Sequence, residues 1–215
     1  DDGLSARNWT SIVEGPQKAF VRKQCRHCLK PACVSACPVG ALSQTGTGAV
    51  VYDGGKCMGC RYCMMACPYA IPRYDWDQTV PYVRKCILCY DRIRAGRQPA
   101  CTEGCPTKAT IFGDRDELIA EAHCRIRDKP ETYIDKVCGE FEVGGTSVLY
   151  ISNVDLTFLT SGESLGEQPV PETTKLAMNS VPFVFTGVLA AMAGVNWIIN
   201  RRIEIQTGGD GDRHG

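Results

Sequence analysis

The chain has 215 residues, in which 24 lysines and arginines balance 24 aspartates and glutamates, so its formal net charge is zero with neutral histidine. That length suits one moderate domain with an appendage, and the balanced charge gives none of the basic field typical of nucleic-acid binding. The 14 cysteines stand out. They could serve disulfides, zinc or iron–sulfur clusters, which their spacing can distinguish.

The N-terminal part, residues 1–24, has a mixed composition without clear periodicity. Its first residues, Asp1 to Leu4, are polar and lack the apolar stretch of a signal peptide, as expected of a mature or truncated chain. The first cysteine run follows and is spaced C-x2-C-x4-C-x3-C before Pro38; it consists of Cys25, Cys28, Cys33 and Cys37.

A short strand over residues 49–53 is predicted between glycine-containing turns. The second run then reads C-x2-C-x2-C-x3-C-P, the bacterial ferredoxin pattern for a 4Fe–4S cluster, with Cys57, Cys60, Cys63 and Cys67. In two-cluster ferredoxins the fourth cysteine of a run binds the other cluster. We therefore expect one cluster on Cys25, Cys28, Cys33 and Cys67, and another on Cys57, Cys60, Cys63 and Cys37.

A third run is spaced C-x2-C-x11-C-x3-C before Pro106 and comprises Cys86, Cys89, Cys101 and Cys105. It either uses its own four thiolates or borrows one from elsewhere. Cys124 and Cys138 are spare and are expected to be small buried apolar residues. A strand over residues 110–113 is predicted after this run, so that cysteine run and short strand recur as an internal repeat.

Disulfides and structural zinc are alternative uses of these cysteines. Neither needs three runs that all end in C-x3-C-P, so the spacing favours iron–sulfur clusters. Tyr52 and Tyr69 are interpreted as core that shields the clusters. No nucleotide-binding loop is present, and we expect no catalytic residues in the chain.

A helix is predicted over residues 114–127, with Asp114 as its N-cap and Glu117 at the capping-box position. A short strand over 148–151 follows, and residues 160–175 are predicted to be a polar linker.

The segment 176–200 contains no charged residue, and its apolar centre of 19 residues, 181–199, approaches the roughly 20 needed to cross a bilayer. We expect a transmembrane helix, with a buried core helix as the alternative. The flanking charges, Arg201 and Arg202 against Lys175, place the C-terminus in the cytoplasm by the positive-inside rule. Residues 201–215 are expected to form a polar, disordered tail.

The sequence thus predicts an α+β fold of repeated bacterial-ferredoxin-like modules, with short strands and cluster-binding loops, and one C-terminal transmembrane helix. Its expected division is an iron–sulfur domain (1–159), a linker (160–175), the membrane helix (176–200) and the tail (201–215).

The first two runs with their flanking residues resemble the ferredoxin subunits of membrane-bound periplasmic nickel–iron hydrogenases. These stretches are Lys23 to Leu42 and Gly59 to Tyr69. The iron–sulfur β subunit of respiratory formate dehydrogenase is similar around the third run, at Gly144-Gly145-Thr146, and in having a single C-terminal membrane helix.

The resemblance implies an electron-transfer subunit without an active site of its own. Its partners would be a catalytic subunit of the hydrogenase or formate dehydrogenase type and a quinone-reactive or cytochrome b-type membrane subunit. The chain would be anchored in the lipid of the inner membrane by a single helix, with its clusters on the periplasmic side after export in folded form. Other molybdenum-type reductases, a cluster-containing enzyme and a zinc protein are the alternatives.

Proteins of this family have four cysteine runs, the first of which would lie upstream of Asp1. We therefore expect three 4Fe–4S clusters from this sequence, and four if an upstream run belongs to the protein. In the family the last run exchanges a ligand with that first run, so Cys105 is the least secure ligand.

Overall fold

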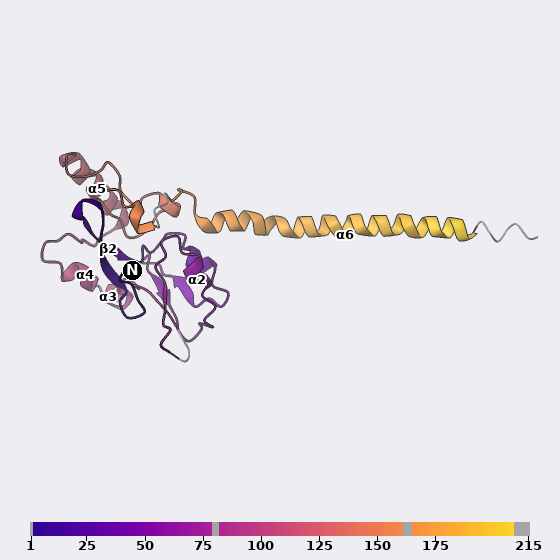
Figure 1. Cartoon of the computed structure of the whole chain (residues 1–215), viewed down its shortest axis with the longest axis horizontal. Helices are drawn as coiled ribbons and strands as arrows, with labels where there is room; N and C mark the ends of the chain where they lie inside the picture. Colours follow the sequence, from indigo (N-terminus) through magenta and orange to yellow (C-terminus); the bar gives the residue numbers. More distant parts are fainter. Residues whose placement is uncertain (1, 79–81, 161–164, 209–215) are drawn as a thin grey trace, which may run out of the picture. The chain divides into compact units, whose positions relative to one another are not determined.

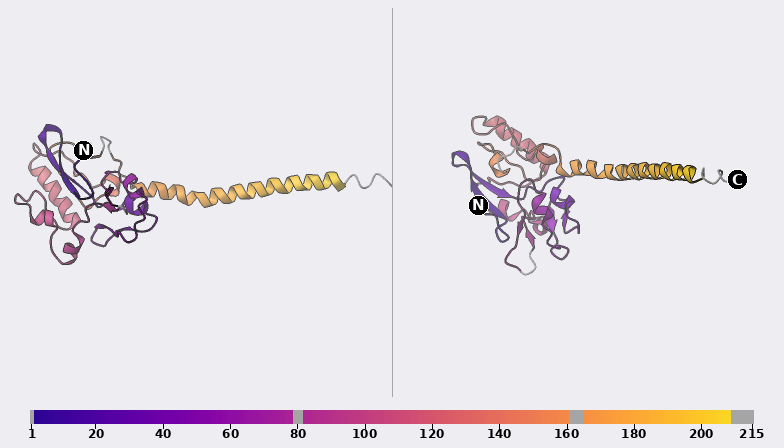
Figure 2. Two further views of the ribbon diagram at one scale, coloured as in Figure 1. Left: turned by 60° about the horizontal axis from the view of Figure 1, so that its bottom comes forward. Right: turned by 45° about the vertical axis from the view of Figure 1, so that its right-hand side comes forward.

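The computed structural model describes residues 2–78, 82–160 and 165–208. It divides into two compact units, Asp1–Pro171 and Glu172–Gly215. The first unit combines short strands and short helices joined by long loops, and the second consists mainly of one helix (Figures 1 and 2).

Three two-stranded antiparallel hairpins provide the strands of the first unit. They are formed by β1 (Thr10–Glu14) with β2 (Phe20–Gln24), β3 (Leu42–Gln44) with β4 (Val50–Tyr52), and β5 (Arg73–Tyr74) with β6 (Val83–Arg84). The second hairpin carries much of the core, because Leu42 and Val50 pack with Val83 and with the side chains of Cys33 and Cys63. Thiols are thus part of the hydrophobic core itself.

Four helices of about one turn lie within or beside the cysteine runs: α1 (Ala32–Ser35), α2 (Tyr62–Met65), α3 (Tyr90–Arg94) and α4 (Ala100–Glu103). The long spacer of the third run is closed by Arg92, which donates to the carbonyl oxygen of Gln98 at 2.9 Å and forms an ion pair with Glu103. This side chain therefore ties α3 to α4.

Helix α5 (Arg115–Asp128) is the longest helix of the first unit. Asp114 caps it by accepting a hydrogen bond from the backbone N–H of Asp116 at 2.9 Å. Ala122 and Ile126 bury one face of the helix against Val137. The prediction of a helix over 114–127 with an Asp114 cap is confirmed.

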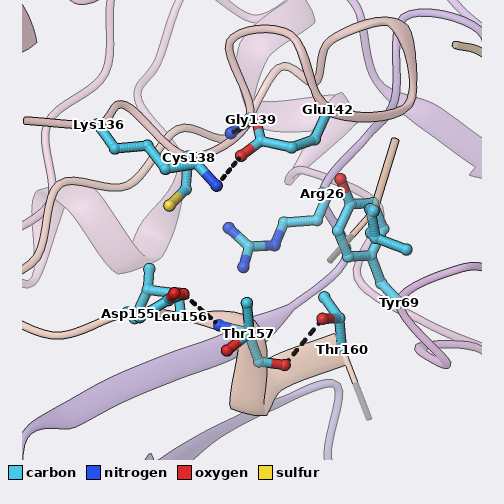
Figure 3. A pocket seen from close by; sticks show the side chains of 11 residues that line it. Arg26, Tyr69, Lys136, Cys138, Gly139, Glu142, Asp155, Leu156, Thr157 and Thr160 are labelled. Atoms are coloured by element: carbon cyan, nitrogen blue, oxygen red, sulfur yellow. Dashed lines mark hydrogen bonds and ion pairs between the residues drawn. The ribbon is translucent and has the colours of Figure 1, made fainter. Parts of the chain in front are cut away.

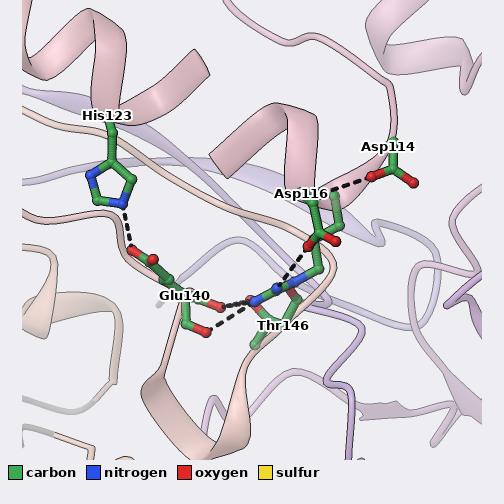
Figure 4. Close-up of polar contacts among 7 residues, drawn as sticks. Asp114, Asp116, His123, Glu140 and Thr146 are labelled. Atoms are coloured by element: carbon green, nitrogen blue, oxygen red, sulfur yellow. Dashed lines mark hydrogen bonds and ion pairs between the residues drawn. The ribbon is translucent and has the colours of Figure 1, made fainter. Parts of the chain in front are cut away.

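Arg115 joins the start of α5 to the loop at residues 139–146, which contains the short 3-10 helix η2 (Glu142–Gly144). Its guanidinium donates to the carbonyl oxygens of Thr146 and Glu140, both at 2.9 Å. About two turns further along, His123 lies 3.0 Å from the Glu140 carboxylate (Figure 4). The loop itself places Cys28 beside Thr146 through an isolated bridge, so α5 supports the backbone around the first cysteine run.

Several predicted strands differ from the structure. The strand predicted at 49–53 is present as β4, whereas 148–151 forms only an isolated bridge, Cys138 with Tyr150. The prediction of a strand over 110–113 is wrong, because these described residues form no strand. Backbone N–H groups of this region, including that of Thr110, act on the sulfur of Cys105 and are not used to pair a strand. The hairpin β1–β2 was not predicted.

The second unit is dominated by α6 (Val170–Gly208) (Figure 1). It is long and apolar enough to cross a membrane over Val170–Gln206, and no residue of its most apolar window is buried. Pro182 lacks the N–H of a helical residue, and the Thr186 hydroxyl donates to its carbonyl oxygen at 2.9 Å. The helix exceeds the predicted range 176–200 at both ends, taking in part of the predicted linker and tail; residues 161–164 and 209–215 lie outside the described residues. The coarser prediction, mixed helix and strand with one apolar C-terminal helix, is confirmed.

Replacing Arg115 with alanine should destabilise the first unit. Two backbone carbonyls of the 139–146 loop would lose a charged donor, and hydrogen bonds to charged groups contribute about 1.5–3 kcal/mol each. We expect a loss of about 2 kcal/mol in unfolding free energy, measured as the midpoint of anaerobic urea unfolding at matched iron content. The control is Arg127→Ala, an exposed arginine on the same helix. Equal midpoints for the two variants would contradict the role given to Arg115.

Candidate iron–sulfur centres

A first group of thiols brings together cysteines from the first and second runs. Burial raises the pKa of Cys28 far above its usual value, and the nearby thiols of Cys25, Cys67 and Cys33 raise it further. Burial likewise raises the pKa of Cys33 to about 12, with Cys25 and Cys67 as its strongest charged neighbours. The structure therefore places these four thiols close together, although Cys67 lies more than 30 residues away in sequence.

A second group is centred on Cys63. Burial raises the pKa of this thiol to about 11, and Cys57, Cys60 and Cys37 raise it further. The same four side chains line one cavity, together with Leu42 of β3, the Tyr52 ring of β4 and Val83 of β6. The fourth cysteine of each of the first two runs thus lies with the other run.

The third run is less well gathered. Burial raises the pKa of Cys86 to about 11, and its neighbours include Cys25 of the first group and Cys89. Cys101 is exposed, at the start of α4. Cys105, beyond the other end of α4, has a pKa lowered to about 7, first by the Thr107 hydroxyl and then by backbone N–H groups. The described residues leave the last two thiols of this run on the surface.

The three runs share two backbone turns. The second residue after the first cysteine has a positive φ in each run: 49° at His27, 75° at Gly59 and 57° at Leu88. The third residue after the last cysteine does too: 62° at Gly40, 49° at Ala70 and 52° at Lys108. Left-handed conformations are costly for residues other than glycine. Their recurrence at matched positions indicates that the same loop geometry is built three times.

The second of these turns directs backbone N–H groups at the last sulfur of each run. Burial alone would raise the pKa of Cys37, but N–H groups of residues 39–42 outweigh it and lower the pKa. The N–H of Ala41 lies 3.2 Å from this sulfur. In the other runs the N–H groups of Tyr69 and Ile71 act on Cys67, and those of Thr107, Ala109 and Thr110 act on Cys105. Such donors favour a thiolate over a thiol.

Two buried polar side chains hold the loops against β4. The ring of His27 is fully buried, and its Nδ1 accepts the backbone N–H of Val50 at 2.9 Å. Lys85 is 3% exposed and donates from Nζ to the carbonyl oxygens of Val50 and, at 3.0 Å, Cys86. Its positive charge acts on Cys33 and Cys67 and partly offsets the rise in their thiol pKa values. The ammonium group therefore lies close to the first thiol group.

Cys138 faces a different environment. It lines a pocket beside the ion pair of Lys136 with Glu142, and the guanidinium of Arg26 points into the same space (Figure 3). Burial raises the pKa of Cys138, Glu142 raises it further, and Lys136 and Arg26 partly offset this. Cys124 lies on α5 near Asp128. Neither thiol belongs to the two groups above. Cys124 was expected to be buried, but its side chain is only partly buried.

The donor sets fit iron–sulfur clusters. All 14 cysteines are free thiols. The second group lines a cavity that Tyr52 also lines, and the buried hydroxyl of Tyr52 has no hydrogen-bond partner of standard geometry among the described residues. Within the described ranges, no three His, Cys, Asp or Glu side chains converge on the position of a single metal ion. A cube does not need such convergence, because each thiolate binds a separate iron.

Comparison with known proteins agrees with this geometry. Residues 17–115 match the family model of the 4Fe–4S dicluster domain. The hydrogenase-2 operon protein HybA of Escherichia coli O157:H7 is 37% identical over 225 residues, covering 91% of this chain and 67% of HybA. The chain belongs to the 4Fe–4S dicluster family. Its cofactor is therefore the 4Fe–4S cluster.

Two other relatives show similar identity to this chain. The iron–sulfur subunit of the nitrate-inducible formate dehydrogenase of E. coli K12 is 35% identical, over 89% of this chain and 68% of that subunit. A protein of Nitratidesulfovibrio vulgaris (Hildenborough) is 42% identical over 86% of this chain. The chain spans 50% of the length of this last relative and about two thirds of the other two.

Sequence reasoning identified the cysteines of this dicluster protein but missed the groups that orient them. The sequence gives no sign that His27 is buried and holds β4, and the donor loops after each Cys-Pro were not predicted. The one available signal was Gly40, because a glycine three residues after a cysteine can mark a left-handed turn. The other runs carry alanine and lysine there, which conceals the pattern.

Gly40→Ala should weaken the second thiol group. Open space surrounds the position, so the added methyl group meets no atom within 4 Å, but a φ of 62° costs a non-glycine residue about 1–2 kcal/mol. We expect a loss of about 1 kcal/mol in anaerobic unfolding free energy and faster iron loss to a chelator. Gly46→Ala, in equally open space without positive φ, is the matched control. Indistinguishable behaviour of the two variants would show that the turn does not depend on glycine.

Proposed function

We propose that this chain is an electron-transfer subunit that relays electrons between a catalytic oxidoreductase subunit and a quinone-reactive membrane subunit. The observation that carries the proposal is the crossed gathering of cysteines from two runs into two groups of four. Bound 4Fe–4S clusters supply one-electron transfer. Two four-thiol groups in one small unit, sharing the Leu42 and Val50 core, suit a relay.

The proposed ligands of the first cluster are Cys25, Cys28, Cys33 and Cys67, and those of the second are Cys57, Cys60, Cys63 and Cys37. At Cys28, Cys33 and Cys63, burial and the neighbouring thiols favour the protonated form when no metal is bound. Iron binding must therefore release protons from these groups. A third cluster would use Cys86, Cys89 and Cys101 with Cys105. Cys105 remains the least secure of these ligands, because the last run of the family exchanges a ligand with a run that would lie upstream of this sequence.

Helix α6 is proposed to anchor the chain in the inner membrane as a single span. Its apolar side chains are exposed along the helix, including those of Phe183, Phe185 and Trp197. This exposure favours a lipid environment over a buried core helix. Arg201 and Arg202 at its end support a cytoplasmic C-terminus and a periplasmic cluster domain.

The catalytic partner is proposed to be of the hydrogenase or formate dehydrogenase type, because HybA and a formate dehydrogenase subunit align with most of this chain. A molybdenum-type reductase is the alternative. We assign no catalytic role to the chain's own residues. Among the charged groups that line the pocket of Cys138, Lys136 is paired with Glu142.

Single serine substitutions of cysteines in the first two runs test the crossed ligand sets. Cys37→Ser should alter the EPR signal that Cys60→Ser alters, whereas Cys67→Ser should alter the signal that Cys28→Ser alters. Each substitution should also lower iron content, because a serine hydroxyl is a poor substitute for the soft thiolate ligand. The measurement is EPR of the anaerobically reduced protein with iron per chain.

Cys124→Ser provides the control for loss of a thiol, because this side chain lies on α5 outside both groups. It should leave both signals intact. If Cys37→Ser instead reproduced Cys28→Ser, each run would bind its own cluster and the proposed crossing would be wrong.

Deleting residues 172–215 should release the cluster domain from the membrane. The first unit ends at Pro171 and contains all the cysteines, so the shortened chain should keep its iron. The full chain should resist alkaline carbonate extraction of membranes and the shortened chain should be extracted. Deleting only 209–215 is the control and should not change extraction. Extraction of the full chain would contradict a membrane-spanning α6.

A further inference from the structure

Tyr52 presents a polar group that the fold leaves unused. It ends β4, and its ring packs against the core formed by Leu42, Val50 and Val83. Its hydroxyl oxygen is buried and has no hydrogen-bond partner of standard geometry within the described chain, although the Cys57 thiol is close enough to act on it. A buried hydroxyl without a partner costs free energy, so such a group in a native protein needs an explanation.

The position of the hydroxyl suggests its missing partner. Tyr52 lines the same cavity as the second thiol group, Cys37, Cys57, Cys60 and Cys63. Burial raises the pKa of Tyr52, and the nearby thiol of Cys57 raises it further, while the Val83 N–H and the charge of Arg84 lower it. The N–H and the guanidinium can only donate hydrogen bonds, so a sulfur is the acceptor available to the phenol proton.

We propose that the Tyr52 hydroxyl donates a hydrogen bond to a sulfur atom of the second cluster, either the Cys57 thiolate or an inorganic sulfide, and thereby raises the reduction potential of that cluster. This inference rests on the proposed ligand set of the second group. A hydrogen bond strengthens as negative charge on its acceptor grows. Reduction adds one negative charge to the cluster, so the donor stabilises the reduced state more than the oxidised state.

A phenol also lies near the first cluster, because burial and then the thiols of Cys28 and Cys67 raise the pKa of Tyr69. Among the phenols of the described residues, however, Tyr52 is the one whose oxygen is buried without a hydrogen-bond partner. Tyr69, which follows Cys67, packs with Cys25 in the core, but the guanidinium of Arg26 lies 5.4 Å from the centre of its ring. The first group is instead approached by the buried ammonium of Lys85. Tyr52 therefore provides the second cluster with a separate means of setting its potential, through a single dipole and without a net charge.

The test is Tyr52→Phe in the full chain, purified anaerobically with its clusters. This change removes one oxygen and keeps the ring that fills the core. An EPR-monitored redox titration should show an equilibrium constant for reduction of the second cluster about tenfold lower, which is 59 mV toward more negative potential for one electron. Pulsed EPR after exchange into deuterated water should lose one exchangeable coupling at this cluster.

Two comparisons make the result specific. Tyr62→Phe removes an exposed phenol hydroxyl from the second run and should leave both the potential and the couplings unchanged. The first cluster in the Tyr52→Phe sample should keep its own potential. A change smaller than twofold in the second cluster, or an equal shift of both clusters, would overturn the inference.

The outcomes also separate this inference from the proposed function. Wild-type protein without a second EPR signal would refute the ligand assignment and, with it, the hydrogen bond. A normal second signal that Tyr52→Phe leaves unchanged would refute only the hydrogen bond, and would indicate that water or another group satisfies the hydroxyl. If Tyr52→Phe failed to keep its iron, the wild-type protein would decide the question, by whether a deuterium coupling is present in addition to those of the backbone N–H groups near Cys37.

Discussion

The structure depends on turning the peptide backbone so that sulfur atoms and N–H groups face the same small volumes. Left-handed residues at matched positions in all three runs, such as His27 and Gly59, accomplish this. Every such residue other than glycine costs conformational energy. That cost must be offset by what the loops enclose, because N–H groups directed at a sulfur form much stronger hydrogen bonds when the sulfur is ionised. The loops are therefore adapted to the metal-bound form of the thiols.

The hydrophobic core is built around the same thiols. Cys25 packs with Leu4 and Ile71 in one buried cluster, and Cys63 packs with Leu42 and Val50 in another. The strands that complete these clusters have only two or three residues in β4, β5 and β6, too few to be stable alone. The cofactors and the fold consequently depend on each other, and this coupling is expected of small metal-binding domains.

Much of this could be predicted from sequence, and the exceptions have physical causes. Cysteine spacing predicts which thiols gather, because ligand spacing is set by local loop geometry, and the Asp114 cap predicts α5. The hairpin β1–β2 was missed because its apolar residues are not confined to one face: Val13 and Val21 pack against a buried cluster, whereas Ile12 and Phe20 are 62% and 68% exposed. The prediction of a strand at 110–113 was wrong because backbone N–H groups there, including that of Thr110, form hydrogen bonds with the Cys105 sulfur. Helix α6 begins earlier than predicted because polar residues such as Glu172 and Lys175 do not prevent a helix from starting.

The crossed thiol groups are proposed to hold 4Fe–4S cubes. The most direct test of this claim is the iron and acid-labile sulfide content of the full chain, purified anaerobically with its partners. The two groups predict at least about eight irons and eight sulfides per chain, and about twelve of each if the third run also binds a cluster. Zinc in place of iron, or iron without sulfide, would contradict the claim.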